Sequence, residues 1–107
     1  MKTESRENMR GGEGSVNFVH LVDTETEKHT RMLAEITLAP GCSVGYHDHQ
    51  NETEYYFILS GSGMVNDNGA EKPVKAGDSI ITGNGASHGL KNTGNVPLVF
   101  TAVIITY

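Results

Sequence analysis

Residues 45–63, GYHDHQNETEYYFILSGSG, place two of the chain's five histidines beside an apolar, aromatic run that ends in glycines. His47 and His49 are one residue apart, so their side chains point to the same face of a β-strand. Val44 and Tyr46 point to the opposite face if that strand is regular. Two imidazoles on one face supply two nitrogen ligands that a single metal ion can bind. The stretch therefore predicts a metal site at the start of a buried sheet.

Period-two alternation continues on both sides of this stretch. Runs rich in β-branched and aromatic residues occupy 15–22, 31–39, 54–61, 78–82 and 97–107. Residues 25–36 admit a helical interpretation, but they lack the apolar stripe that a helix requires. Turn-forming residues separate the runs, and Asn68-Gly69 is a strong signal for a two-residue hairpin. These features predict an all-β sandwich or barrel.

Length and charge limit the classes of protein to consider. At 107 residues the chain is expected to form one domain, with residues 15–107 in the barrel and the charged residues 1–14 as a mobile or partner-seeking arm. The net charge of −5 argues against a nucleic-acid partner. No apolar run approaches the roughly 18 residues of a membrane helix, and the first fourteen residues lack the apolar core of a signal peptide. With a single cysteine, Cys42, these features lead us to expect a cytoplasmic protein.

The spacing around the histidine pair resembles the two motifs of the cupin superfamily. The first motif, G-x5-H-x-H-x3,4-E-x6-G, is matched by Gly41, His47, His49, Glu54 and Gly61. The second, G-x5-P-x-G-x2-H-x3-N, is matched by Gly77, Gly85, His88 and Asn92, with Gly83 where the family has proline. We expect this replacement to alter the stiffness of a turn and to leave the ligands alone.

The resemblance implies a single-domain antiparallel jelly-roll β-barrel. In size, the chain is similar to the small stand-alone bacterial cupins that are likened to oxalate decarboxylases or mannose-6-phosphate isomerases. The resemblance also implies a metal inside the barrel, with His47, His49, Glu54 and His88 as its ligands. In the family the ion is commonly manganese, iron, nickel, zinc or another divalent metal. Three imidazoles and one carboxylate leave open positions on an octahedral ion.

Glu52 competes with Glu54 for the carboxylate position, because the two residues have the same parity along the chain. Glu54 keeps the six-residue distance to Gly61, whereas Glu52 lies in an expected turn. The register therefore favours Glu54. Of the other histidines, His29 lies in a polar stretch and His20 alternates with apolar residues, so neither is expected to bind metal.

Two classes of function follow. A metalloenzyme would bind a small carboxylate or other oxygenated metabolite at the open positions, for decarboxylation, isomerisation or dioxygenation. Proton transfer would need a further residue, and Gln50, Glu52 and Tyr56 are the candidates. The alternative is a non-catalytic module that binds or senses a sugar or small organic acid. We favour an enzyme and a carboxylate such as oxalate over a sugar phosphate, because no basic cluster accompanies Lys75 and Lys91, the cations nearest the motifs.

The edges of such a barrel must be covered. We therefore expect a homodimer in which the arm and the strand at 15–22 pair with the sheet of a second subunit.

Overall fold

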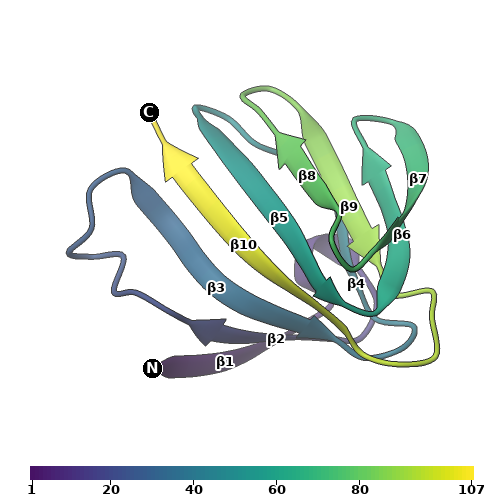
Figure 1. Cartoon of the computed structure of the whole chain (residues 1–107). Helices are drawn as coiled ribbons and strands as arrows, with labels where there is room; N and C mark the ends of the chain where they lie inside the picture. Colours follow the sequence, from purple (N-terminus) through teal and green to yellow (C-terminus); the bar gives the residue numbers. More distant parts are fainter.

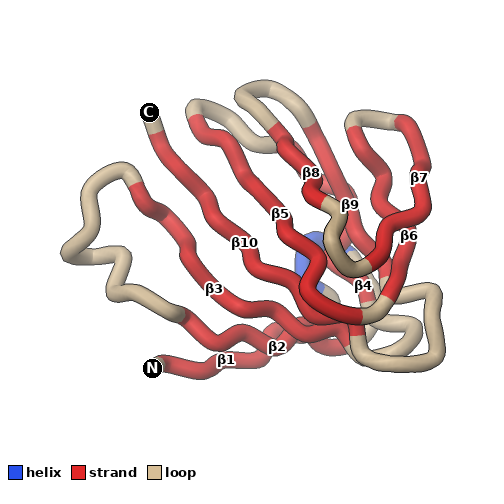
Figure 2. The backbone as a smooth tube through the Cα atoms, in the orientation of Figure 1, coloured by secondary structure: helices blue, strands red, loops and turns tan.

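The computed structural model describes Met1–Tyr107 and consists of two antiparallel β-sheets that face each other (Figure 1). In spatial order, the first sheet contains β1 (Lys2–Glu7), β2 (Ser15–His20), β3 (Thr30–Leu38), β10 (Leu98–Thr106), β5 (Glu52–Ser60) and β8 (Ser79–Thr82). The second contains β4 (Ser43–Asp48), β9 (Ser87–Lys91), β6 (Ser62–Asp67) and β7 (Ala70–Lys75). One short 3-10 turn, η1 (Met9–Gly11), is the single helical element (Figure 2). The predicted antiparallel jelly roll is confirmed.

The hydrophobic core lies between the inner faces of the two sheets. Strand β10 shows how the sequence pattern produces it, because Leu98, Phe100, Ala102 and Ile104 alternate with less buried residues and are each at most 3% exposed. Strand β10 pairs with β3 on one side and β5 on the other, so both of its edges are covered. The centre of the first sheet is therefore hydrogen-bonded on both sides of β10, and it packs against the sheet that carries His47 and His88.

The β6–β7 hairpin confirms the turn predicted at Asn68-Gly69. Both residues have positive φ, 52° and 96°, as a two-residue turn matching the twist of its flanking strands requires. The two strands themselves were not predicted, because their sequences are polar and β7 contains Pro73. Proline is tolerated there because β7 is an edge strand.

Residues 1–14, expected as an arm, pack against the same chain. Strand β1 pairs with β2 from Lys2↔His20 to Glu7↔Ser15, and η1 lies against β4. Strand β1 has no apolar pattern that would predict it, and all but one of its six residues are exposed. The structure contains no helix with the length and hydropathy of a membrane-spanning segment.

Strand β4 is irregular, and this corrects the predicted facing of Val44. Its pairing with β9 shifts register between Val44 and His47, so the strict alternation is broken there. Val44 is buried and lines the same cavity as His47 and His49, while Tyr46 is 51% exposed. The irregularity thus places Val44 inside with the histidines, and Tyr46 points outward as expected.

Candidate metal centre

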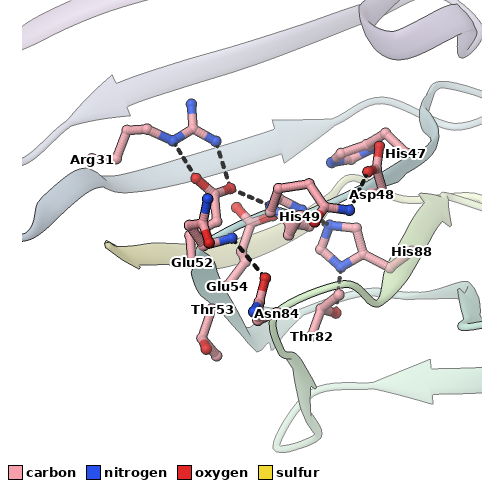
Figure 3. Close-up of polar contacts among 12 residues, drawn as sticks. Arg31, His47, Asp48, His49, Glu52, Thr53, Glu54, Thr82, Asn84 and His88 are labelled. Carbon is pink, nitrogen blue, oxygen red and sulfur yellow. Dashed lines mark hydrogen bonds and ion pairs between the residues drawn. The ribbon is translucent and has the colours of Figure 1, made fainter. Parts of the chain in front are cut away.

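The structure brings together His47, His49, Glu54 and His88, the four residues expected as ligands (Figure 3). His47 lies on β4 and His49 directly follows that strand, while Glu54 comes from β5 and His88 from β9. The pairing of His47 with His88 joins the two motifs across the second sheet. Glu54 reaches the group from the facing sheet. The four potential ligand atoms lie within 4.8 Å of one another, so the cluster is able to hold a metal ion.

The separations between ligand atoms test whether a metal fits. His49 Nε2 lies 3.0 Å from His88 Nε2, and Glu54 Oε1 lies 3.1 Å from the first and 2.9 Å from the second. Two ligands bonded at right angles, each about 2.1 Å from an ion, are about 3.0 Å apart, against about 3.4 Å in a tetrahedron. These three atoms therefore match one triangular face of an octahedral site. Three imidazoles and a carboxylate are also a chemically suitable donor set.

Each histidine is oriented through its other ring nitrogen. His47 Nδ1 lies 2.7 Å from the carbonyl oxygen of Gly45, and His88 Nδ1 lies 2.7 Å from the hydroxyl of Thr82. His49 Nδ1 lies 2.5 Å from a carboxylate oxygen of Glu52. When each Nδ1–H donates to its acceptor, each Nε2 lone pair is left free for a metal. The acceptors thus orient the rings and are compatible with the tautomer needed for metal binding.

The carboxyl group of Glu54 is buried within the cluster, and the residue is 4% exposed. Burial alone would raise the pKa of its carboxyl, but the bonds to His49 and His88 outweigh burial and lower that pKa to about 2. Burial lowers the pKa of His47, and the neighbouring imidazoles act in the same direction. An ionised Glu54 and a neutral His47 suit a metal. Burial would lower the pKa of His49, but the bonds to Glu54 and Glu52 outweigh burial and raise that pKa, so a metal would have to displace a proton from His49.

Glu52 occupies a different position from the one that competition with Glu54 suggested. One oxygen contacts His49 Nδ1, and the carboxylate accepts two bonds from Arg31, at 2.8 and 2.7 Å. Burial opposes ionisation of Glu52, but these two partners outweigh it and lower the pKa. Figure 3 shows the resulting chain from Arg31 through Glu52 to His49.

The other two candidates for proton transfer lie in contrasting surroundings. Tyr56 is 3% exposed, stacks on His88 with ring centroids 4.7 Å apart and lines the cavity beside the cluster. Burial and the nearby charge of Glu54 raise its pKa well above the usual value, so the hydroxyl stays protonated. The Gln50 amide donates to Asp48 at the exposed surface.

Sequence reasoning missed the arginines at this site. A cavity of about 30 Å³ beside the cluster is lined by Arg6, Arg10 and Arg31 as well as by His47, His49 and Glu54. The arginines precede the first motif by many residues, so motif spacing carried no signal for them. Thr82 was likewise missed, although it lies within the expected strand at 78–82.

Comparison with known proteins agrees with this geometry. Residues 34–104 match the family described as Cupin domain. An oxalate-binding protein from Thermotoga maritima is 50% identical over 99 residues, which cover 92% of this chain and 82% of that protein. The crystal structure of a predicted oxalate decarboxylase from the same organism has a TM-score of 0.95 at 46% identity, covering 100% of this chain and 94% of that one.

More distant relatives share part of the chain. A tetracenomycin polyketide synthase protein, TcmJ, from Streptomyces glaucescens is 37% identical over 65 residues, 61% of this chain and 44% of that protein. The Cnp3 cupin domain of Schizosaccharomyces pombe has a TM-score of 0.79 at 15% identity, covering 97% of this chain and 69% of that one, and shows the fold alone. The family match, the paired motifs and the converging ligand atoms agree, and this chain belongs to the cupin domain family.

Proposed function

We propose that this protein holds one divalent transition metal through His47, His49, Glu54 and His88 and uses the metal to bind a small carboxylate such as oxalate. The observation that carries the proposal is the convergence of four ligand atoms whose histidines are each oriented by a second bond. Four protein ligands leave two positions on an octahedral ion, enough for two carboxylate oxygens. The name of the 50% identical oxalate-binding protein supports the same ligand.

The space beside the cluster favours a small ligand. A cavity of about 30 Å³ holds about two water molecules, which two carboxylate oxygens would replace. A sugar phosphate is much larger than this inner cavity. The mixed lining suits a small anion, because Val44 and Tyr56 exclude water while the arginines supply positive charge.

Binding is favoured over turnover by the positions of the three candidates for proton transfer. Glu52 is bonded to Arg31 and His49, and Gln50 is bonded to Asp48 at the surface. Tyr56 alone lines the cavity, and its pKa, raised well above the usual value by burial, makes its hydroxyl a poor proton donor near neutral pH. A metal-dependent decarboxylase, isomerase or dioxygenase is therefore the second candidate function, and Tyr56 is the residue on which proton delivery would depend. In a decarboxylation, cleavage of the carbon–carbon bond of oxalate would release carbon dioxide, and a proton would complete formate.

The test separates the metal, the ligand and the reaction. Elemental analysis of purified protein should find about one divalent metal per chain, and the His88→Ala variant should lose it. Calorimetry should then show oxalate binding to the metal-loaded protein and none to the metal-free protein. Metal-loaded protein that fails to bind oxalate would refute the proposed ligand, whereas formate release under the same conditions would establish the enzyme. We propose manganese as the first metal to test, with iron, nickel and zinc as alternatives.

A homodimer and a cytoplasmic location complete the proposal. Strand β2 is paired on both edges, whereas β1 keeps one edge free. We propose the exposed apolar outer face of β5 and β8 as the contact with a second copy. Phe57, Leu59 and Ile81 are 49–62% exposed there. Sedimentation should show a dimer that Ile81→Lys weakens, and a monomeric wild type at micromolar concentration would refute it. Fractionation of the source cells would test the location.

A further inference from the structure

All three arginines of the chain line the one small cavity beside the metal ligands. Arg6 comes from β1, Arg10 from η1 and Arg31 from β3, and none of the five lysines lines the same cavity. Arginine presents a planar fork of donors that matches a carboxylate with two parallel bonds, which lysine does not. Of the two kinds of cation, the cavity therefore has only the one that suits a planar anionic group.

Two of these arginines already have carboxylate partners. Arg31 donates twice to Glu52, and Arg6 donates twice to Glu4, at 3.1 and 3.0 Å. The Arg6 guanidinium also lies over the ring of Phe18, 4.7 Å from its centre. Arg10 makes no ion pair and no side-chain hydrogen bond within the chain. Arg10 is exposed, and of the three arginines that line this cavity it is the one without a partner in the chain.

The segment that carries Arg10, residues 8–14, is held in place as an N-terminal clip. The Asn8 amide donates to the Gly14 carbonyl at 2.8 Å and closes the clip, while Arg10 takes the left-handed conformation at φ 55°. Such backbone is costly for a residue with a side chain and persists where its surroundings enforce it.

Close contacts with strand β4 hold the N-terminal clip in this conformation. A Cβ atom on Gly45 would lie 2.0 Å from the carbonyl oxygen of Arg10, and one on Gly12 would lie 2.3 Å from that of Ser43. The clip and the strand therefore approach more closely than any other residue would allow at either position. Ser43 adds two bonds, because its amide donates to the Glu13 carbonyl and its hydroxyl accepts from the Glu13 amide, both at 2.8 Å.

The charges at the cavity match a dianion. A divalent ion held by the single carboxylate of Glu54 leaves one uncompensated positive charge, and Arg10 supplies a second. The guanidinium groups of Arg6 and Arg31 are each balanced by a glutamate. On the proposed function, we infer that Arg10, positioned by the N-terminal clip, binds the outward oxygens of a small dicarboxylate whose inner oxygens bind the metal. Arg10 thereby selects dicarboxylates over monocarboxylates.

The test compares two ligands and two variants on metal-loaded protein. Calorimetry measures the affinity for oxalate and for acetate, and elemental analysis of each sample measures metal content. Arg10→Ala should weaken oxalate binding at least tenfold, change acetate binding less than twofold and leave metal content unchanged. Arg10→Lys should recover only part of the oxalate affinity, because it keeps the charge but lacks the fork. Lys75→Ala, which removes a charge on exposed β7, serves as the matched control and should behave as wild type.

A second variant tests the clip without altering Arg10. Gly12→Ala should displace the clip from β4 and weaken oxalate binding in the same direction, again with metal retained. If Arg10→Ala binds oxalate as tightly as wild type, the inference is wrong while the proposed function stands. If wild type carries metal but binds no oxalate, the proposed function and the inference both fail. Equal weakening for acetate and oxalate would also overturn the inference, because Arg10 would then contribute general charge rather than selection.

Discussion

Replacing Thr82 with valine should weaken metal binding more than it weakens the fold. Thr82 and His88 are each 1% exposed, and the Thr82 hydroxyl lies 2.7 Å from His88 Nδ1. Valine keeps the branched shape but cannot accept a hydrogen bond. In metal-free protein the His88 ring can shift its proton to Nε2 and donate to Glu54 Oε1, 2.9 Å away. A bound metal would occupy Nε2 of His88, so in the Thr82→Val variant the proton would have to stay on Nδ1, where it has no hydrogen-bond acceptor.

The expected magnitude follows from that difference. A buried donor left without a partner costs about 1–3 kcal/mol, and the metal-bound state bears this cost in full. Loss of a group that orients a metal ligand typically reduces affinity about 10- to 100-fold, which is about 1.4–2.8 kcal/mol. The two figures agree, so we expect a 10- to 100-fold rise in the metal Kd. The metal-free protein should lose less stability than this, because its tautomer can change.

Chelator competition gives the metal Kd, and urea unfolding with and without metal gives the two stabilities. Thr101→Val is the matched control, because Thr101 lies on β10, is half-buried and makes no side-chain hydrogen bond. A Thr82→Val protein that folds and binds metal within twofold of wild type would refute the reasoning. It would show that packing alone orients the His88 ring.

The two remaining predictions concern the ion pairs near the cavity. Arg31→Met should lower metal affinity about tenfold by freeing Glu52, with Arg31→Lys intermediate; chelator competition without oxalate measures this, and an unchanged Kd would contradict it. Glu4 has a pKa of about 2, lowered from 4.5 by hydrogen bonds from Arg6 and then His20. Because the folded pKa lies below the unfolded value, this carboxylate stabilises the fold above pH 4.5, and the contribution is lost as pH falls toward 2. The stability gap between wild type and Glu4→Gln in urea should therefore shrink over that range, and a gap independent of pH would contradict it.

The members of the cluster could be named from the sequence because two histidines one residue apart share a face of a strand and because the spacing of the motifs resembles that of the cupin family. His47 and His49 share a face in any regular strand, and the register to Gly61 favoured Glu54. In the structure a carboxylate oxygen of Glu54 lies 2.9 Å from His88 Nε2. The sequence nevertheless presents Glu52 and Glu54 as alternatives for a single position, whereas both contribute to the site. Both face the site, one toward the ligand atoms and the other toward the far nitrogen of His49.

The residues that surround the cluster could not be predicted from the sequence, because their positions depend on the topology of the fold. Arg31 meets Glu52 because β10 lies between β3 and β5 and brings their ends together. Arg10 meets the cavity because a polar segment with no apolar pattern folds back onto β4. Val44 was assigned to the wrong face, because an irregularity in strand pairing has no simple mark in the sequence. Each failure involves either a contact between distant segments or a local break in periodicity.

Gly45 connects the two halves of the proposed site. Its carbonyl oxygen accepts the bond from His47 Nδ1, and its lack of a side chain admits the carbonyl of Arg10. On the proposed function, a ligand bound to both Arg10 and the metal would contact groups on both sides of this short stretch of β4. Because coupling between two binding events is reciprocal, an increase in carboxylate affinity caused by the metal requires an equal increase in metal affinity caused by the carboxylate. The contact at Gly45 places the segment that carries Arg10 directly beside the strand that carries His47.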